Sequence, residues 1–370
     1  MEDVFCFADD LGPLKIVHIY RPSLGLRAVV AVDNVACGPA IGGVRMAPDV
    51  STEEAFRLAR AMTLKNAAAG LAHGGGKSVI YGDPKMPIGD KERLIRAFAS
   101  AIADLTEYIP GPDMGTDELA MGWIKDETGR SVGLPREIGG IPLDEIGATG
   151  FGLAAAIDVA SRQIGLELRG ARVVVQGFGS VGRHAARFLA ENGATLVAAS
   201  DSQGTIVDSA GLDIAALAVL KAKGRSLKEH SHGRSAGTDA VIDVPCDIWI
   251  PAARPDVITA ANVARLNARL VAQGANIPCT TEAEQALAAR GVLVLPDFIA
   301  NAGGVICAAI EYHGGTQAQA FAAIDEKIRA NTQAVLEEAK RTKSLPRTAA
   351  VSLAKERVRR AMRTRRWEGR

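Results

Sequence analysis

Two lysines stand in sequence settings that suit acid–base chemistry. Lys77 follows three glycines in His73-Gly-Gly-Gly-Lys77, and Lys65 lies near the end of a predicted helix that stops at Gly70. Because glycine has no side chain, a small ligand could approach Lys77 closely. A lysine held beside another cation in a water-poor site has a lowered pKa and becomes a usable base. The alternative is that both lysines are solvated on the surface, the usual state of this residue.

A carboxylate that could exchange protons with these lysines is Asp113. It ends the segment Ile109-Pro-Gly-Pro-Asp113, which we predict to be a proline-stiffened loop. The alternative is a turn or helix-capping aspartate, because aspartate favours both positions. Thr116 is predicted to cap the helix that follows.

A second chemical signal is the spacing G-x-G-x-x-G at Gly177, Gly179 and Gly182. An apolar strand from Val173 ends at the first glycine. A helix, Ser180–Asn192, then opens with its free N–H groups available to a pyrophosphate. In this motif the glycines permit the tight turn, the approach of the pyrophosphate and the packing of helix on strand. A glycine turn without a ligand is the alternative.

The residues around these glycines complete a dinucleotide-binding prediction. Phe178, Ser180 and Val181 lie within the turn, and Asp201 ends the next predicted strand, Thr195–Ser200. An acid at that place can accept hydrogen bonds from an adenosine ribose. It would also repel a 2′-phosphate, and Ser202-Gln203-Gly204 offers no cation; the nearest basic candidate is Arg183. We therefore expect NAD rather than NADP.

Regular elements must position these groups in two domains, since 370 residues exceed one small core. In the first part, strands are predicted at 15–20 and 26–32, a capping box at Ser51-Thr-Glu-Glu54, a glycine-rich loop at 73–77 and a short strand, Ser78–Tyr81. From Val173 onward strands alternate with helices, which predicts a doubly wound parallel sheet. Its later strands are expected at 247–251, 270–273 and 292–296.

The composition excludes several classes of protein. The chain is 48% hydrophobic with a net charge of +1, which favours a globular protein without a nucleic-acid or membrane partner. No run of about 18 apolar residues predicts a membrane span. The acidic N-terminal segment differs from a signal peptide, and five scattered cysteines fit reduced thiols, so a cytoplasmic protein is expected. His230-Ser-His232 lacks a third ligand, and no metal is predicted.

Several motifs, in order along residues 12–350, resemble those of the glutamate/leucine/phenylalanine/valine dehydrogenases. They are Gly38–Arg45, Met62–Gly70, Gly74–Lys77, Pro112–Thr116, Ala148–Gly150, Gln273–Asn276 and Pro296–Val305. The resemblance implies reversible NAD-dependent oxidative deamination of an L-amino acid to a 2-oxo acid and ammonia. It also implies two α/β domains with a cleft between them. The first, 1–147, binds substrate and oligomerises, and helices 341–370 return to it; the second, 148–340, is the Rossmann-type dinucleotide-binding domain.

The resemblance implies a role for each matching residue. Lys65 matches the lysine that binds the substrate α-carboxylate, Lys77 the catalytic lysine that activates water, and Asp113 the acid that shuttles protons. Thr149 matches a residue near the nicotinamide amide, and Asn276 one near the nicotinamide ribose and the substrate. The remaining cofactor-binding positions are expected at Ala252, Ala253 and Asn301. As in the family, a homo-oligomer is expected.

The resemblance also bears on the substrate side chain. Glutamate enzymes have a lysine before the paired glycines Gly42 and Gly43, where this chain has Ile41. A serine of those enzymes corresponds to Ala308, which with Val305 lines the same pocket. We therefore expect an apolar substrate such as leucine or valine. Glutamate or phenylalanine is the alternative within the family, and an inactive dinucleotide-binding sensor is the alternative outside it.

Overall fold

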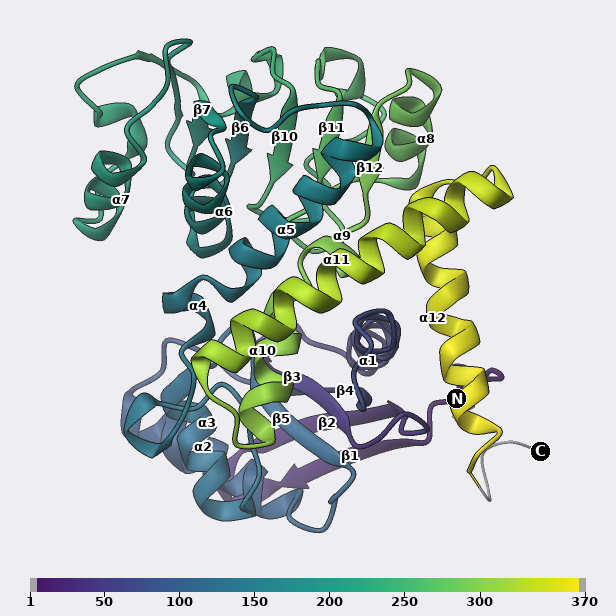
Figure 1. Cartoon of the computed structure of the whole chain (residues 1–370). Helices are drawn as coiled ribbons and strands as arrows, with labels where there is room; N and C mark the ends of the chain where they lie inside the picture. Colours follow the sequence, from purple (N-terminus) through teal and green to yellow (C-terminus); the bar gives the residue numbers. More distant parts are fainter. Residues whose placement is uncertain (1–4, 366–370) are drawn as a thin grey trace. The chain divides into compact units, whose positions relative to one another are not determined.

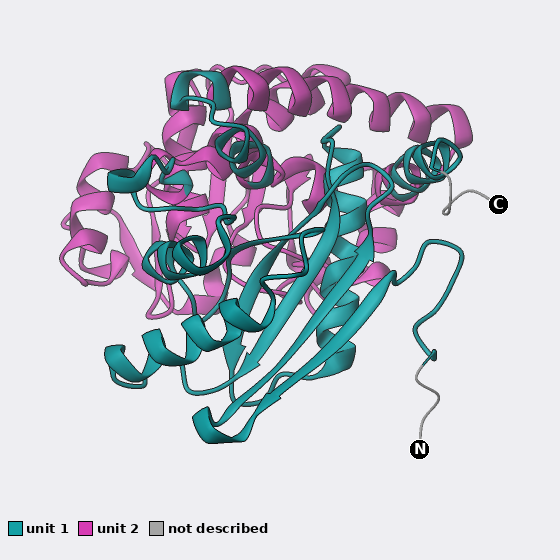
Figure 2. Cartoon of the chain, turned by 90° about the horizontal axis from the view of Figure 1, so that it is seen from below, with its two compact units in different colours: residues 1–143, 305–320, 351–370 teal, residues 144–304, 321–350 magenta. Residues whose placement is uncertain are grey.

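The computed structural model describes residues 5–365 of the chain, which form two compact units (Figures 1 and 2). Unit 1 comprises 1–143, 305–320 and 351–370, and unit 2 comprises 144–304 and 321–350. This division differs from the expected one in three places, of which the first is that residues 144–147 belong to unit 2. The segment 305–320 belongs to unit 1 although it directly follows unit 2 in the chain, and residues 341–350 belong to unit 2.

Unit 1 is built on a five-stranded sheet in the order β1-β2-β4-β3-β5. The strands are β1 (Lys15–Arg21), β2 (Leu26–Asn34), β3 (Ala40–Ala47), β4 (Gly74–Tyr81) and β5 (Tyr108–Pro112). The pairs β1–β2 and β2–β4 are antiparallel, whereas β3 pairs in parallel with both β4 and β5. The predicted strands at 15–20 and 26–32 are confirmed as β1 and β2.

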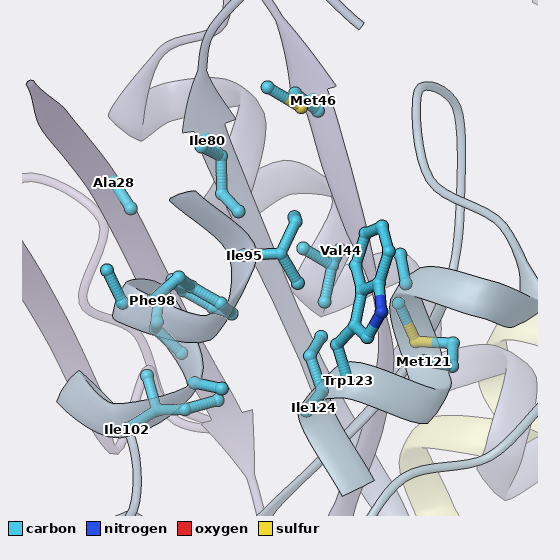
Figure 3. Close-up of a cluster of buried hydrophobic side chains, with 14 of the residues drawn as sticks. Ala28, Val44, Met46, Ile80, Ile95, Phe98, Ile102, Met121, Trp123 and Ile124 are labelled. Carbon is cyan, nitrogen blue, oxygen red and sulfur yellow. The ribbon is translucent and has the colours of Figure 1, made fainter. Parts of the chain in front are cut away.

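Helices cover the two faces of this sheet. On one face α1 (Thr52–Ala68) buries Ala55 and Ala59 against Val29, Ala31 and Val79. The other face packs against α2 (Ile88–Ala101) and α3 (Glu118–Thr128). Figure 3 shows Ile95, Phe98, Trp123 and Ile124 of these helices gathered with Val44 and Ile80 of the strands. These apolar contacts fix the sheet that carries the candidate catalytic groups.

Two segments predicted as loops are strands. The glycines at 74–76 lie within β4, because their missing side chains let other groups approach: a Cβ at Gly74 would lie 1.7 Å from the Asn34 carbonyl oxygen. Residues 108–112 form β5, the edge strand beside β3. Its prolines are tolerated there because an edge strand leaves backbone donors unpaired on one side. Lys77 therefore lies inside a strand and Asp113 directly follows one.

Two predicted caps also need correction. Ser51 does accept a hydrogen bond from the Glu54 backbone N–H, but the Glu54 carboxylate bonds to Arg45 instead of completing a capping box. Helix α3 is capped by Asp117, not by Thr116, whose hydroxyl donates to the Val44 carbonyl. In both cases the side chain that the local sequence pattern assigned to a helix cap bonds instead to a residue on a neighbouring strand.

Unit 2 contains a seven-stranded sheet in the order β12-β11-β10-β6-β7-β8-β9. Strands β6 (Arg172–Gln176), β7 (Thr195–Ser200), β10 (Ile248–Pro251), β11 (Leu270–Ala272) and β12 (Leu293–Leu295) run parallel. Two short antiparallel strands, β8 (Thr205–Val207) and β9 (Arg234–Ala236), extend one edge. The predicted Rossmann-type sheet is confirmed.

The helices of unit 2 follow the strand–helix alternation. They include α5 (Ala148–Gln163), α6 (Ser180–Glu191), α7 (Ile214–Ala222), α8 (Thr281–Ala289) and α9 (Asp297–Ala300). Short α4 (Leu143–Ile146) precedes α5, and α10 (Gly303–Tyr312), α11 (Gln317–Thr342) and α12 (Pro346–Met362) complete the described chain (Figure 1). No helix among residues 5–365 is long and apolar enough to cross a membrane.

The later part of α12 is anchored within unit 1. The Arg357 guanidinium donates to the carbonyls of Ala67 and Leu71, at 2.7 and 2.9 Å, and Ala354 and Val358 pack beside Ala67. These contacts hold the C-terminal helix against the end of α1, the helix that carries Lys65.

Candidate active site

Lys77 and Asp113 meet in unit 1 as a directly hydrogen-bonded ion pair between Nζ and Oδ2. A third charged group completes the cluster: Arg45 Nε lies 2.9 Å from Asp113 Oδ1, and its terminal nitrogen bonds to Glu54. The four groups form a chain of alternating charge. The structure thus brings together the two residues predicted to be catalytic and adds two that the sequence analysis did not assign.

The strands explain how these groups meet. Successive residues of a strand point to opposite faces, so Ile41, Gly43 and Arg45 of β3 share a face. Asp113 comes next to that face because β5 pairs in parallel with β3, Gly43 lying opposite Gly111. The Lys77 side chain, on β4, is 5% exposed and meets the same carboxylate.

The paired glycines have a structural reason in this arrangement. A Cβ at Gly42 would lie 1.6 Å from the Gly76 carbonyl oxygen, and one at Gly43 would lie 2.7 Å from the Asp113 Cβ. The Tyr108 hydroxyl lies 2.8 Å from the Gly42 carbonyl and 2.9 Å from the Ser78 hydroxyl. Larger residues at 42 or 43 would push β4 or Asp113 away, so these glycines set the position of the acid–base pair.

Burial and charge shift the pKa values of both groups. Burial of the Lys77 ammonium lowers its pKa, and the nearby Arg45 adds to this, while Asp113 partly offsets it. Burial alone would raise the pKa of Asp113, but Lys77 and Arg45 together hold it below its usual value. Asp113 is therefore kept ionised while Lys77 gives up its proton more readily than a surface lysine.

Apart from Asn276, which belongs to unit 2, the expected substrate-binding residues belong to unit 1 as well. Lys65 lies in the last turn of α1, and its neighbour Asn66 donates to the Gly74 carbonyl at 2.7 Å, tying α1 to the start of β4. Ile41 is 3% exposed, and Ala308, on α10, is also buried. Val305 begins the part of α10 that belongs to unit 1.

A buried carboxylate that the sequence analysis missed holds α10 in unit 1. Glu311 accepts hydrogen bonds from the backbone N–H groups of Gly133, Leu134 and Ile141, at 2.7, 3.2 and 2.7 Å. Burial raises the pKa of Glu311 despite these donors. A glutamate in an otherwise apolar helix, Val305–Glu311, was the available signal, because such a carboxylate needs partners when buried.

The glycine turn of unit 2 has the geometry of a phosphate cradle. Gly177 adopts φ +96°, which only glycine takes readily, and a Cβ on Gly182 would lie 2.1 Å from the Gly177 carbonyl oxygen. In contrast, a Cβ on Gly179 would meet no atom within 4 Å. Gly179 also precedes α6 without a side-chain cap, so the first N–H groups of the helix remain for an anion.

Neighbouring residues frame this cradle. Thr149 lies in the first turn of α5, which packs closely on α6: a Cβ on Gly150 would lie 2.6 Å from the Ala185 nitrogen. A Cβ on Gly177 would lie 2.6 Å from that of Ala253, and the Ala252 N–H donates to Gln176. Phe178 is fully buried, so it can serve a ligand through its backbone only.

Further polar groups point to a ligand of the cradle. Gln176 Oε1 and Asn301 Oδ1 are buried and have no hydrogen-bond partner among residues 5–365. Asn301 Nδ2 donates to the exposed Asn276 at 2.9 Å. Ser180 Oγ donates to the Asp144 carbonyl, and Val181 packs beside Gly274. Two buried oxygen acceptors without a partner, next to a glycine turn that is open to an anion, fit a site for a nicotinamide dinucleotide. The α6 N–H groups and Asn276 would hold this ligand.

Asp201 is placed differently from the prediction. Its side chain is 5% exposed and accepts hydrogen bonds from the backbone of Gln203, Gly204 and Leu227. Lys221 Nζ lies 3.1 Å from its Oδ2. The sequence analysis named Arg183 as the nearest basic candidate, but α7 brings Lys221, from 20 positions later in the chain, into contact with Asp201.

No group of three or more His, Cys, Asp or Glu side chains in the described part of the chain could hold a metal ion. The imidazole of His230 bonds instead to the backbone of His232.

The sequence matches two family models. Residues 139–366 match the Glutamate/Leucine/Phenylalanine/Valine dehydrogenase model, and residues 20–130 match the Glu/Leu/Phe/Val dehydrogenase dimerisation domain. The chain belongs to the Glu/Leu/Phe/Val dehydrogenase family. The predicted resemblance is thereby confirmed, and the protein is an amino acid dehydrogenase that uses a nicotinamide dinucleotide.

Characterised relatives of this Glu/Leu/Phe/Val dehydrogenase include several glutamate dehydrogenases. This chain is 40% identical over 357 residues to the glutamate dehydrogenase of Aeropyrum pernix, and the match covers 90% of this chain and 85% of the relative. It is 36% identical to an NADP-specific enzyme of Saccharolobus shibatae (90% and 83% covered). A catabolic NAD-specific enzyme of Bacillus subtilis is 35% identical (82% and 72% covered).

Solved structures of the family include enzymes named for different substrates. The hetero-hexameric glutamate dehydrogenase of Thermus thermophilus, in its Leu-bound form, has a TM-score of 0.86 at 30% identity, covering 95% of this chain and 90% of that one. The L-tryptophan dehydrogenase of Nostoc punctiforme has a TM-score of 0.74 at 27% identity, covering 95% and 97%. Overall similarity therefore leaves the substrate open.

Proposed function

We propose that the enzyme catalyses reversible oxidative deamination of an apolar L-amino acid, of leucine or valine type. The overall reaction converts the amino acid, water and the oxidised dinucleotide to the 2-oxo acid, ammonium, the reduced dinucleotide and a proton. The observation that carries the choice of substrate is Ile41, a buried apolar side chain on the strand face that also bears Arg45.

The proposed roles combine the family resemblance, which supplies that of Lys65, with the charged cluster of Lys77 and Asp113. Lys65 binds the α-carboxylate of the substrate. Lys77, whose pKa is lowered by burial, takes a proton from the attacking water and polarises the carbonyl in the reverse direction. Asp113 exchanges protons with the amino group. A bound nicotinamide dinucleotide would supply the hydride-accepting chemistry at the substrate Cα.

The electrostatics of unit 1 disfavour a second substrate carboxylate. Ile41 and Ala308 carry no charge or donor, and Arg45, on the same strand as Ile41, already bonds to Asp113 and Glu54. Burying an unpaired carboxylate beside these groups would cost several kcal/mol. Burying a leucine side chain contributes roughly 1.5–3 kcal/mol in the favourable direction.

Glutamate is the second candidate substrate, because the relatives named above are glutamate dehydrogenases. The test compares kcat/KM for glutamate, leucine, valine and phenylalanine in the natural enzyme and in Ile41→Lys. We expect leucine or valine to be best in the natural enzyme, and glutamate to gain most in Ile41→Lys. Ile41→Met, of similar bulk and uncharged, is the control. Glutamate as the best substrate of the natural enzyme would refute the proposal.

For the cofactor we propose NAD, with NADP also accepted. The charge of Lys221 offsets that of Asp201, which weakens the repulsion expected for a 2′-phosphate. Fluorescence titration with NADH and NADPH tests this, and Lys221→Met is expected to weaken NADPH binding more than NADH binding. An equal loss for both would remove Lys221 from cofactor selection. Tight NADH binding with no turnover of any amino acid would instead indicate a dinucleotide sensor.

We also propose a homo-oligomer, supported by the match of residues 20–130 to a dimerisation domain and by the hexameric Thermus thermophilus relative. Light scattering after size-exclusion chromatography tests this. A purely monomeric enzyme would contradict it.

A further inference from the structure

A buried charged network in unit 2 lies outside the residues assigned so far. Arg347, in the first turn of α12, bonds through Nε to Glu284 Oε1 and Oε2 at 2.8 and 3.0 Å. Its other nitrogens lie 2.8 Å from Gln273 Oε1 and 2.9 Å from Asp297 Oδ1. The Glu284 and Asp297 side chains are only 4% and 7% exposed. One guanidinium thus serves two buried carboxylates.

The network holds both ends of the loop 273–277, which contains Asn276. At one end, Gln273 is fully buried and also donates to Glu284 through Nε2 at 2.7 Å. At the other end, the Ile277 N–H donates to Asp297 Oδ2 at 2.8 Å. Arg347 therefore contacts one end of the loop directly, at Gln273. It supports the other end through Asp297, which accepts the hydrogen bond of the Ile277 N–H.

The loop needs this support because its backbone is strained. Ile277 adopts φ +48°, a left-handed conformation that a β-branched residue rarely takes. Such a residue persists only where its surroundings hold it. The carboxylate that binds its N–H, Asp297, is in turn paired with Arg347. Loss of the guanidinium would leave the buried carboxylates of Glu284 and Asp297 without the cation that both contact, and they would have to move or take up protons.

Arginine fits this place better than lysine. The planar guanidinium donates hydrogen bonds to Glu284 and Gln273 in fixed directions and at the same time lies within ion-pair distance of Asp297 Oδ1. A lysine carries a single ammonium, which can keep the charge but cannot reach all three partners in this geometry.

We propose that Arg347 is a positioning residue for the dinucleotide site, acting through the loop 273–277 on Asn276. The proposal rests on the proposed function through the role given to Asn276. Arg347 itself contacts neither cofactor nor substrate; it sets where the Asn276 amide lies. The C-terminal helix thereby contributes to cofactor binding although it carries none of the family motifs quoted above.

The test measures NADH affinity by fluorescence titration, kcat, KM for the amino acid and thermal stability in Arg347→Met and Arg347→Lys. We expect Arg347→Met to weaken NADH binding and raise KM by roughly tenfold or more, since small misplacements of binding groups are costly. Arg347→Lys should recover part of the affinity. Arg290→Met is the matched control, because Arg290 also binds carbonyls within unit 2, those of Val263 and Leu266, away from the loop.

A merely structural arginine would lower the thermal stability of Arg347→Met as in Arg290→Met and leave NADH affinity and KM unchanged, which would overturn the proposal. If Arg347→Met does not fold, Arg347→Lys combined with Asn276→Ala decides. Action through Asn276 predicts that Asn276→Ala adds little loss in the Arg347→Lys enzyme, and full additivity contradicts it. Because NADH binding is measured without turnover, a wrong substrate assignment would not mask the result.

Discussion

Replacing Arg45 should shift the pH dependence of catalysis in a direction fixed by the cluster geometry. Arg45 lowers the pKa of both Asp113 and Lys77. In Arg45→Met both values rise, so Lys77 keeps its proton to a higher pH. The acidic limb of the kcat/KM profile for deamination, which reports the free enzyme, therefore moves to higher pH.

The size of the shift follows from distance and burial. Arg45 Nε lies 2.9 Å from Asp113 Oδ1, and the two side chains are 21% and 20% exposed. Unit charges about 4 Å apart interact by about 4 kcal/mol at an effective dielectric constant near 20. Arg45 bonds to Asp113 and not to Lys77, and partial exposure screens its charge, so the pKa of Lys77 should shift by less than the upper end of the roughly 1–3 units typical of a carboxyl beside an arginine. We expect the limb to move by about 1 unit.

Glu54→Gln provides a control of opposite sign. Glu54 raises the pKa of Lys77 and shares Arg45 with Asp113. Removing its charge should lower the pKa of Lys77 and move the acidic limb to lower pH. The assay is initial-rate kinetics with the best amino acid across a pH series, with circular dichroism to confirm folding.

Two results would refute this reasoning. A uniform fall in kcat/KM with an unmoved limb would mean that Arg45 only orients Asp113. Shifts of the same sign in Arg45→Met and Glu54→Gln would mean that the charges do not act as the geometry indicates.

Three further perturbations separate chemistry, ligand binding and folding. Lys77→Ala and Asp113→Asn should each lose about 10²–10⁴-fold in kcat with little change in NADH affinity, as measured by fluorescence titration; near-normal turnover in either would exclude that residue. Gly179→Ala should weaken NADH binding at unchanged melting temperature, whereas Gly182→Ala should lower both, because only the second Cβ meets protein atoms. Glu311→Ala should lower the free energy of unfolding by about 2–4 kcal/mol in urea, since three buried N–H groups lose their acceptor.

The sequence best predicted those features that residues adjacent in the chain determine. The turn at Gly177–Gly182, the helix after it and the strand Thr195–Ser200 are read from neighbouring residues, and the structure has them as α6 and β7. A glycine turn between a strand and a helix is specified by local backbone conformation. The membership of the family follows equally from short motifs in a fixed order.

The glycine and proline patterns of unit 1 misled because their meaning depends on packing. Gly74–Gly76 were expected to form a loop, yet they lie in β4 between β2 and β3, where side chains would collide with neighbouring backbone. The prolines of β5 are compatible with a strand only because that strand lies at the edge of its sheet.

The tertiary structure alone decided which charges meet. Arg45 and Asp113 are 68 positions apart and become neighbours because β3 and β5 pair; Lys221 neutralises Asp201 because α7 packs near the end of β7. Arg347 meets Gln273 from 74 positions away. The residue types along the chain determined which acids and bases were available. Which of them pair depends on the fold, because the attraction between two charges weakens with distance and only folding brings distant segments within a few ångströms.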